Sequence, residues 1–156
     1  MVHLSGEAGT SDKEAALLDL ITFLKAGDYH FVTPTPATHA RVLARASHSR
    51  AQDLRDIFGW SLPFDPQQID PLLLRILRDA DMVEQQGDGL KSRLRVSSLG
   101  DDLILHSAYP TDGQDAVFFG PDSYRFARLI RQQLSNHPQR AGARLIDIGT
   151  GAGAGA

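Results

Sequence analysis

The chain contains no cysteine, and this absence removes several kinds of chemistry at once. Disulfide bonds, thiolate nucleophiles and cysteine-ligated zinc are all excluded. The sequence also lacks an apolar run long enough to span a bilayer, and its first residues lack the basic and apolar segments of a secretory signal. We therefore expect a cytoplasmic protein with no membrane partner.

Strong charge of either sign is also missing. The 156 residues carry a formal net charge of −3, and residues 1–110 carry 11 Lys and Arg against 15 Asp and Glu. This balance argues against bulk attraction to nucleic acid, although it permits a local basic patch. Six histidines are present, at positions 3, 30, 39, 48, 106 and 137. None has the spacing of a metal ligand, so we expect no metal and interpret them as ordinary surface or boundary residues.

The first two thirds of the chain predict a mainly helical domain. Residues 1–10 are expected to form a flexible tail. A capping box of Ser11 and Glu14 is predicted to open a helix that ends at Gly27. Further helices are predicted over residues 38–46, over residues 50–58, and after the Asp65-Pro66 pair, and the last of these carries Leu72, Leu73, Ile76 and Leu77 at helical spacing. We interpret Trp60 as core or interface packing rather than a base-stacking platform.

The pattern then changes to strands. Residues 81–86 are short and extended, residues 87–89 form a turn, and residues 101–107 predict a further strand. Residues 90–96 alternate, with Leu90, Leu94 and Val96 on one face and Lys91, Arg93 and Arg95 on the other. Helices followed by a small β wing are typical of a winged-helix domain, here spanning residues 11–108. The fold class expected is therefore α+β. The basic face of the strand has two interpretations: it contacts nucleic acid or an acidic protein, or it is simply a solvated surface.

Residues 109–156 are expected to form a linker followed by one helix and one strand. Asp122 is the expected cap of a helix with Tyr124, Ala127, Ile130 and Leu134 on one face, which ends at His137-Pro138. The Phe118-Phe119 pair is interpreted either as core or as pocket lining. An apolar strand is predicted over residues 144–148, and a loop of glycine and alanine follows it.

This loop has the composition of a cofactor-binding turn. Asp147 precedes glycines at alternate positions, Gly149, Gly151 and Gly153, which let a backbone turn sharply and approach a ligand. The loop also satisfies the dinucleotide pattern through Gly149, Gly151 and Ala154, but dinucleotide strands usually carry an apolar residue at the position of Asp147. A flexible tail without a ligand is the third interpretation.

The acid followed by alternating glycines resembles motif I of class I S-adenosylmethionine-dependent methyltransferases. The stretch VFFGPDSYRFA is similar to the segment before motif I in release-factor glutamine methyltransferases, where Pro121, Asp122 and Ser123 match a Pro-Asp/Glu-Thr element. The whole arrangement also resembles a bacterial group in which a winged-helix-like domain precedes such a methyltransferase domain. The resemblance implies S-adenosylmethionine as cofactor. It implies that Asp147 lies at the amino group of the cofactor and that three glycines lie against its methionine moiety: Gly149, Gly151 and Gly153. Four further residues would line the same pocket: Phe119, Pro121, Asp122 and Ser123.

The chain departs from this family after the glycine loop. It has no acidic residue at the end of a second strand and no Asn-Pro-Pro-Tyr element, both of which we expect beyond Ala156. The resemblance therefore implies that residues 109–156 are a linker and the truncated start of a Rossmann-like α/β methyltransferase domain. We interpret the chain as the N-terminal, recognition part of a transferase that methylates a nitrogen nucleophile, and expect this part alone to be inactive. No catalytic residue is assigned. The alternatives are a non-enzymatic winged-helix module that binds nucleic acid or protein, and a dinucleotide-binding enzyme.

Overall fold

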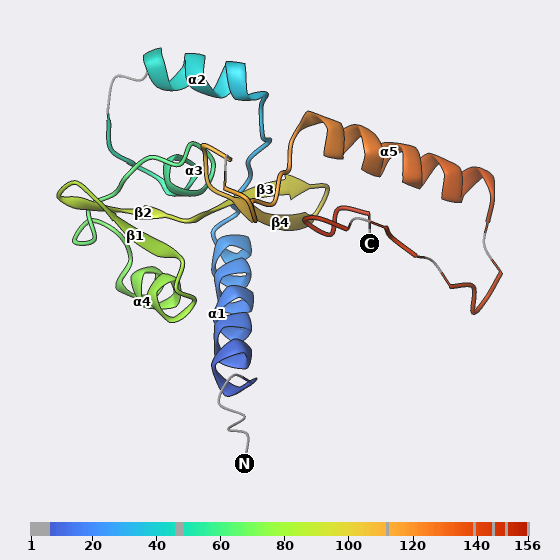
Figure 1. Cartoon of the computed structure of the whole chain (residues 1–156), viewed down its shortest axis with the longest axis horizontal. Helices are drawn as coiled ribbons and strands as arrows, with labels where there is room; N and C mark the ends of the chain where they lie inside the picture. The colour runs from blue at the N-terminus through green and yellow to red at the C-terminus, as the bar shows by residue number, and fades with distance from the viewer. Residues whose placement is uncertain are drawn as a thin grey trace.

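The chain is an α+β protein built from five helices and two small antiparallel sheets within the residues that the structure describes (Figure 1). The structure is a computed structural model, and it describes residues 7–45, 49–111, 113–138, 140–144, 146–148 and 150–155. The helices are α1 (Glu7–Ala26), α2 (Pro36–Arg45), α3 (Leu54–Phe58), α4 (Pro71–Asp79) and α5 (Pro121–Asn136). The strands are β1 (Val83–Gln86), β2 (Gly89–Ser92), β3 (Leu94–Leu99) and β4 (Asp102–Ser107).

One hydrophobic core joins the N-terminal helices to the strands. α1 packs against α4, and α3 packs against β2 and β3. Leu20 and Leu24 of α1, Phe58 of α3 and Leu77 of α4 are fully buried in this core, together with Val96 of β3. Burial of each such side chain contributes about 1.5–3 kcal/mol, so this part of the chain has the apolar contacts that a stable fold needs. Trp60 is partly buried and packs against the core, as expected from the sequence.

Two helices lie apart from this core. Figure 1 shows α2 above the strands on one side and α5 on the other, with the C-terminal residues running back below α5 toward β4. In α2, His39 is the buried residue, and most of the other side chains face solvent. In α5, Ala127 is buried, whereas Phe126 and Leu129 are half exposed.

Helices α1, α3 and α4 start at other residues than the sequence predicted. α1 begins at Glu7, so the expected tail over residues 1–10 loses residues 7–10 and Ser11 lies inside the helix, where Glu and Ala favour its continuation. α3 begins only at Leu54, because the Asp53 carboxylate accepts a hydrogen bond from Asp56 N at 2.9 Å. Local sequence does not show which of the two neighbouring pairs, Asp65-Pro66 or Asp70-Pro71, opens the fourth helix, and in the structure it is Asp70-Pro71.

At that second pair, Asp70 caps α4 through a bond from Leu72 N at 2.8 Å. Asp65 instead accepts a bond from Gln67 N at 2.9 Å and closes a turn. The residues of α4 that face the core are Leu73, Ile76 and Leu77, as predicted, while Leu72 is exposed.

The predicted strand over residues 90–96 is divided at Arg93. Ser92 Oγ donates to Leu94 O at 2.8 Å and accepts from Leu94 N at 3.2 Å, and this local bonding separates β2 from β3. β1 pairs with β2, and β3 pairs with β4 with Ser97 opposite Ile104. Because of the break, the simple alternation fails: Arg95, expected on a solvated face, is only 4% exposed.

Candidate functional site

A groove is bordered by α5, β4 and the C-terminal segment. The groove has a volume of about 800 Å³. Its walls are Leu103 and Ile104 of β4 and Ile130 and Leu134 of α5, with Asp147 at the C-terminal side. The predicted strand over residues 144–148 does not form in the described residues 144 and 146–148. A lone strand has no neighbour to satisfy its backbone groups, which accounts for this irregular path.

Within this segment, Asp147 is the residue with an unsatisfied polar atom. Its Oδ2 is buried and has no hydrogen-bond partner among the described residues. A Cβ added at Gly155 would lie 2.7 Å from this oxygen, so a larger residue there would displace the Asp147 carboxylate. Gly151 and Gly153 both have positive φ, of 52° and 75°, as a glycine turn requires. Gly149 lies outside the described residues.

The other residues implied by the resemblance lie at the start of α5. Phe119 is buried and contacts two rings, His106 at 5.4 Å and Tyr124 at 5.0 Å between ring centroids. Pro121, Asp122 and Ser123 form the first turn of α5, and the lining of the groove beside Asp147 includes none of these four residues. The structure therefore does not bring the two halves of the expected cofactor site together.

The cap of α5 is also different from the prediction. Gly120 is the N-cap, and its N–H donates to Ser123 Oγ at 3.3 Å. Asp122 is not the cap: it lies in the first turn and pairs with Arg125 at 3.1 Å on the surface. The two residues of the Phe118-Phe119 pair have different surroundings: Phe119 is buried in the core and Phe118 is half exposed.

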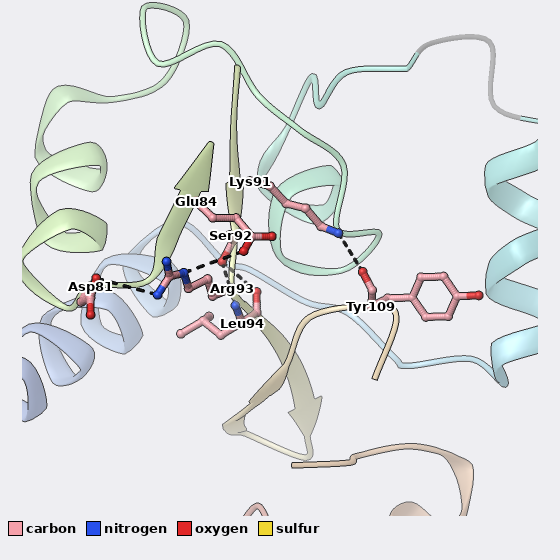
Figure 2. Close-up of polar contacts among 7 residues, drawn as sticks. All are labelled: Asp81, Glu84, Lys91, Ser92, Arg93, Leu94 and Tyr109. Atoms are coloured by element: carbon pink, nitrogen blue, oxygen red, sulfur yellow. Dashed lines mark hydrogen bonds and ion pairs between the residues drawn. The ribbon is translucent and has the colours of Figure 1, made fainter. Parts of the chain in front are cut away.

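The three basic residues of the predicted wing have different surroundings. Figure 2 shows Lys91 Nζ donating to the carbonyl of Tyr109, at 2.8 Å, and Arg93 pointing toward Asp81 and Glu84. Both of the Arg93 ion pairs are long, at 3.9 Å. Arg95 turns inward instead, where its Nε donates to Gly59 O at 2.9 Å and its guanidinium lies over the ring of Phe31. Arg95 cannot contact a partner in this arrangement, since its side chain is buried.

A buried chain of hydroxyl and imidazole groups crosses the sheet. Ser97 Oγ on β3 contacts Thr33 Oγ1 on one side and His106 Nε2 of β4 on the other, the latter at 2.8 Å. The N–H of Thr33 in turn donates to the hydroxyl of Tyr124 on α5, at 3.1 Å. These bonds tie the segment before α2, the second sheet and α5 together. Burial lowers the pKa of His106 to about 3, with Arg95 adding a smaller effect of the same sign, so the imidazole is neutral.

His39 makes a second buried aromatic contact. Its ring stacks on Tyr109, with centroids 4.2 Å apart and planes inclined by 29°, and also touches Trp60. The side chain is 1% exposed, and neither ring nitrogen makes a hydrogen bond of ordinary distance and angle in the described part of the chain, although the Trp60 backbone lies close enough to oppose the lowering of the pKa of the imidazole. Burial and, to a lesser extent, Arg95 lower the pKa of His39 to about 4. Nη2 of Arg95 is likewise buried without a partner.

Sequence reasoning missed these buried polar residues. His39 and His106 were expected at the surface or a boundary, and both are core. For His106 a signal existed, because period two places it on the same face of β4 as Ile104. For His39 no local signal existed, since its burial depends on how α2 docks. His30 and His137 are exposed, and His3 and His48 lie outside the described residues.

Other candidate sites are scarce in the described residues. No group of three or more His, Asp or Glu side chains there could hold a metal ion. None of the described helices is both long and apolar enough to cross a bilayer. No family model, curated protein or solved structure matches this chain.

Proposed function

We propose that the chain carries a winged-helix-like recognition domain and the first cofactor-binding segment of an S-adenosylmethionine-dependent methyltransferase that acts on a nitrogen nucleophile. The observation that carries the proposal is Asp147. Its motif places an acid before alternating glycines, and its Oδ2 is buried with no donor among the described residues. A carboxylate in this position fits a ligand with an ammonium group, because burial of an unpaired carboxylate oxygen is costly.

The exposed isoleucines beside Asp147 support the same proposal. Ile146 and Ile148 are 85% and 92% exposed. Alternating apolar residues of this kind pack well when further strands flank them on both sides, as in a parallel sheet. We propose that such strands come from sequence outside this chain.

In this proposal the chain binds and orients rather than performs chemistry. Asp147 accepts from the amino group of the cofactor, and the backbone of Gly151 and Gly153 approaches it without a Cβ in the way. S-adenosylmethionine, when bound, supplies an activated methyl group. Holding the acceptor in line with that group and excluding water account for most of the rate enhancement in such a reaction.

The test is binding of S-adenosylmethionine to the product of the full reading frame that encodes this chain, by titration calorimetry. We expect micromolar binding, and Asp147→Asn is expected to weaken it at least about tenfold by removing the charged acceptor. Asp101→Asn, which changes the same charge in the exposed turn between β3 and β4, is the matched control. Tight binding of NAD alone, or no binding of S-adenosylmethionine, overturns the proposal.

A nucleic-acid-binding module remains the second candidate, and Arg93 is the observation that favours it. Its guanidinium is half exposed, and both of its ion pairs are long at 3.9 Å, so a phosphate could replace them. Gel shift with a generic duplex at low salt tests this candidate. Binding with a salt dependence that Arg93→Ala makes shallower supports it, and absence of binding at low salt rejects it.

A further inference from the structure

A second groove, on the opposite side of the core from α5, has the features of a protein-docking site. It has a volume of about 470 Å³ and lies where α1, α3 and α4 meet the loop before α4. Its apolar lining comes from Phe23, Leu54, Ile57, Phe64, Ile69 and Leu73. Ile57, Phe64 and Leu73 are fully buried, whereas Phe23, Leu54 and Ile69 are partly exposed. The groove therefore offers apolar surface to a ligand on a base that is part of the core.

The rim of this groove is acidic. Asp53, Asp65 and Asp70 all line it, and the lining contains no Lys or Arg among the described residues. Each of these carboxylates uses one oxygen, Oδ1, to accept a backbone N–H bond, from Asp56, Gln67 and Leu72 respectively. The second oxygen of Asp53 lies 3.5 Å from Arg55, a contact at the surface. The backbone bonds fix where the three carboxylates point, so the rim presents a preformed set of acceptors.

The arrangement does not resemble a metal site. The three aspartates surround an apolar base, and no group of metal-ligating side chains is found within the described residues. Separate carboxylates around an apolar pocket are complementary to a peptide segment in which one large apolar side chain is flanked by cationic side chains.

We propose that this groove binds a segment of another protein that presents one large apolar side chain between Lys or Arg residues. The apolar side chain enters between Leu54, Ile69 and Phe23, and the flanking cations pair with the rim aspartates. Burial of the apolar group supplies most of the affinity, while the charges set specificity and the rate of association. The proposal rests on neither S-adenosylmethionine nor methyl transfer.

The probe is a fluorescein-labelled peptide with one Phe flanked on each side by two Arg, measured by fluorescence polarisation on the full chain. Asn caps helices and turns nearly as well as Asp, so Asp53→Asn, Asp65→Asn and Asp70→Asn remove charge without removing the backbone bonds. Each is expected to weaken binding about twofold to fivefold, and added salt is expected to reduce the difference. Asp101→Asn, the same change in the turn between β3 and β4, is the matched control and is expected to leave binding unchanged.

Two further changes test the apolar part. A peptide with Ser in place of Phe is expected to bind at least about tenfold more weakly, because the buried apolar surface is lost. Ile69→Ser in the groove is expected to have an effect of similar size, and Leu18→Ser, at an exposed apolar residue elsewhere on α1, is expected to have none. Binding that is indifferent to all groove variants, or that falls equally with Asp101→Asn, overturns the proposal, as does absence of binding at low salt. Binding of S-adenosylmethionine is measured separately, so either proposal can fail alone.

Discussion

Both ends of this chain carry apolar residues at regular spacing, but only the N-terminal ones are packed. Leu20 and Leu24 of α1 are fully buried against α4 and the strands, whereas Ile146 and Ile148 near the C-terminus are exposed. The difference lies in the partners available and not in hydrophobicity. A helix satisfies its own backbone and needs only one apolar surface to pack against, while a strand needs neighbours for its backbone as well.

Polar groups do not follow the same division. Ser97 Oγ lies at hydrogen-bond distance from His106, and Asp53 and Asp70 accept from backbone N–H groups at helix N-termini. Buried polar atoms without a partner among the described residues occur in both regions: the ring nitrogens of His39 and Nη2 of Arg95 in the packed part, and Oδ2 of Asp147 in the C-terminal segment. An unpaired buried atom therefore does not by itself distinguish the C-terminal segment, and the exposure of Ile146 and Ile148 carries the contrast.

The largest test of the comparison is to remove a core side chain. Phe58→Ala deletes a fully buried ring that packs beside Tyr29. We expect the free energy of unfolding to fall by about 3–5 kcal/mol, from lost burial and the cavity that remains. Urea denaturation followed by circular dichroism measures it. Leu18→Ala, at an exposed position of α1, is the control and should cost less than about 0.5 kcal/mol.

Acid should destabilise the core through its buried histidines. Burial holds the pKa of His106 at about 3, whereas in the unfolded chain it returns to its ordinary value near 6.5. The unfolded state therefore binds the proton first, so the contribution of neutral His106 is complete above pH 6.5 and is lost as the pH falls toward 3. By pH 5, protonation linked to His106 alone is expected to lower the free energy of unfolding by about 2 kcal/mol relative to pH 8. Unfolding free energies at a series of pH values check this, and a flat profile between pH 8 and 5 would contradict it.

His39 allows a cleaner version of the same experiment. Its ring nitrogens make no hydrogen bond of ordinary geometry in the described structure, and the nearby Trp60 backbone is the one polar group that affects the pKa through a hydrogen bond, so His39→Phe keeps the stacking on Tyr109 and Trp60 and removes a titrating group. We expect this variant to match the parent at pH 8 within about 1 kcal/mol and to lose less stability at pH 5. A variant that is strongly destabilised at pH 8 would show that the imidazole has a partner, such as a bound water.

The sequence predicted the features that depend on local periodicity and missed those that depend on contacts between distant or irregular segments. The core face of α4, with Leu73, Ile76 and Leu77, and the strand β4 were predicted, because their periodicities reflect local geometry. The inward turn of Arg95 was not, since it depends on the hydrogen bonds that Ser92 makes with Leu94. The strand predicted over residues 144–148 is not formed in the described residues, because a strand needs a neighbour for its backbone groups and local sequence does not show whether one is present.

Two aspartates at helix starts, Asp70 in α4 and Asp122 in α5, allow a smaller test of how the core and the C-terminal region differ. Asp70→Ala removes the carboxylate that accepts from Leu72 N at the start of α4 and should cost about 1 kcal/mol. Asp122→Ala changes a residue that was predicted to cap α5 but only pairs with Arg125 at the surface, and should cost less than about 0.5 kcal/mol. Thermal unfolding of the two variants side by side distinguishes them. Equal losses would mean that Asp122 contributes to the start of α5 in a way that its contacts do not reveal.

The smallest expected effect is at Ile148. In this chain Ile148→Ala removes a side chain that is almost fully exposed, so the free energy of unfolding should change by less than about 0.3 kcal/mol. In the product of the full reading frame, where we propose that further strands cover this residue, the same change should cost about 2–5 kcal/mol, as for other buried isoleucines. Chemical denaturation of both proteins measures the pair. An equally small effect in both would mean that residues 146–148 never enter a sheet, and the C-terminal segment would then have no role in binding a cofactor.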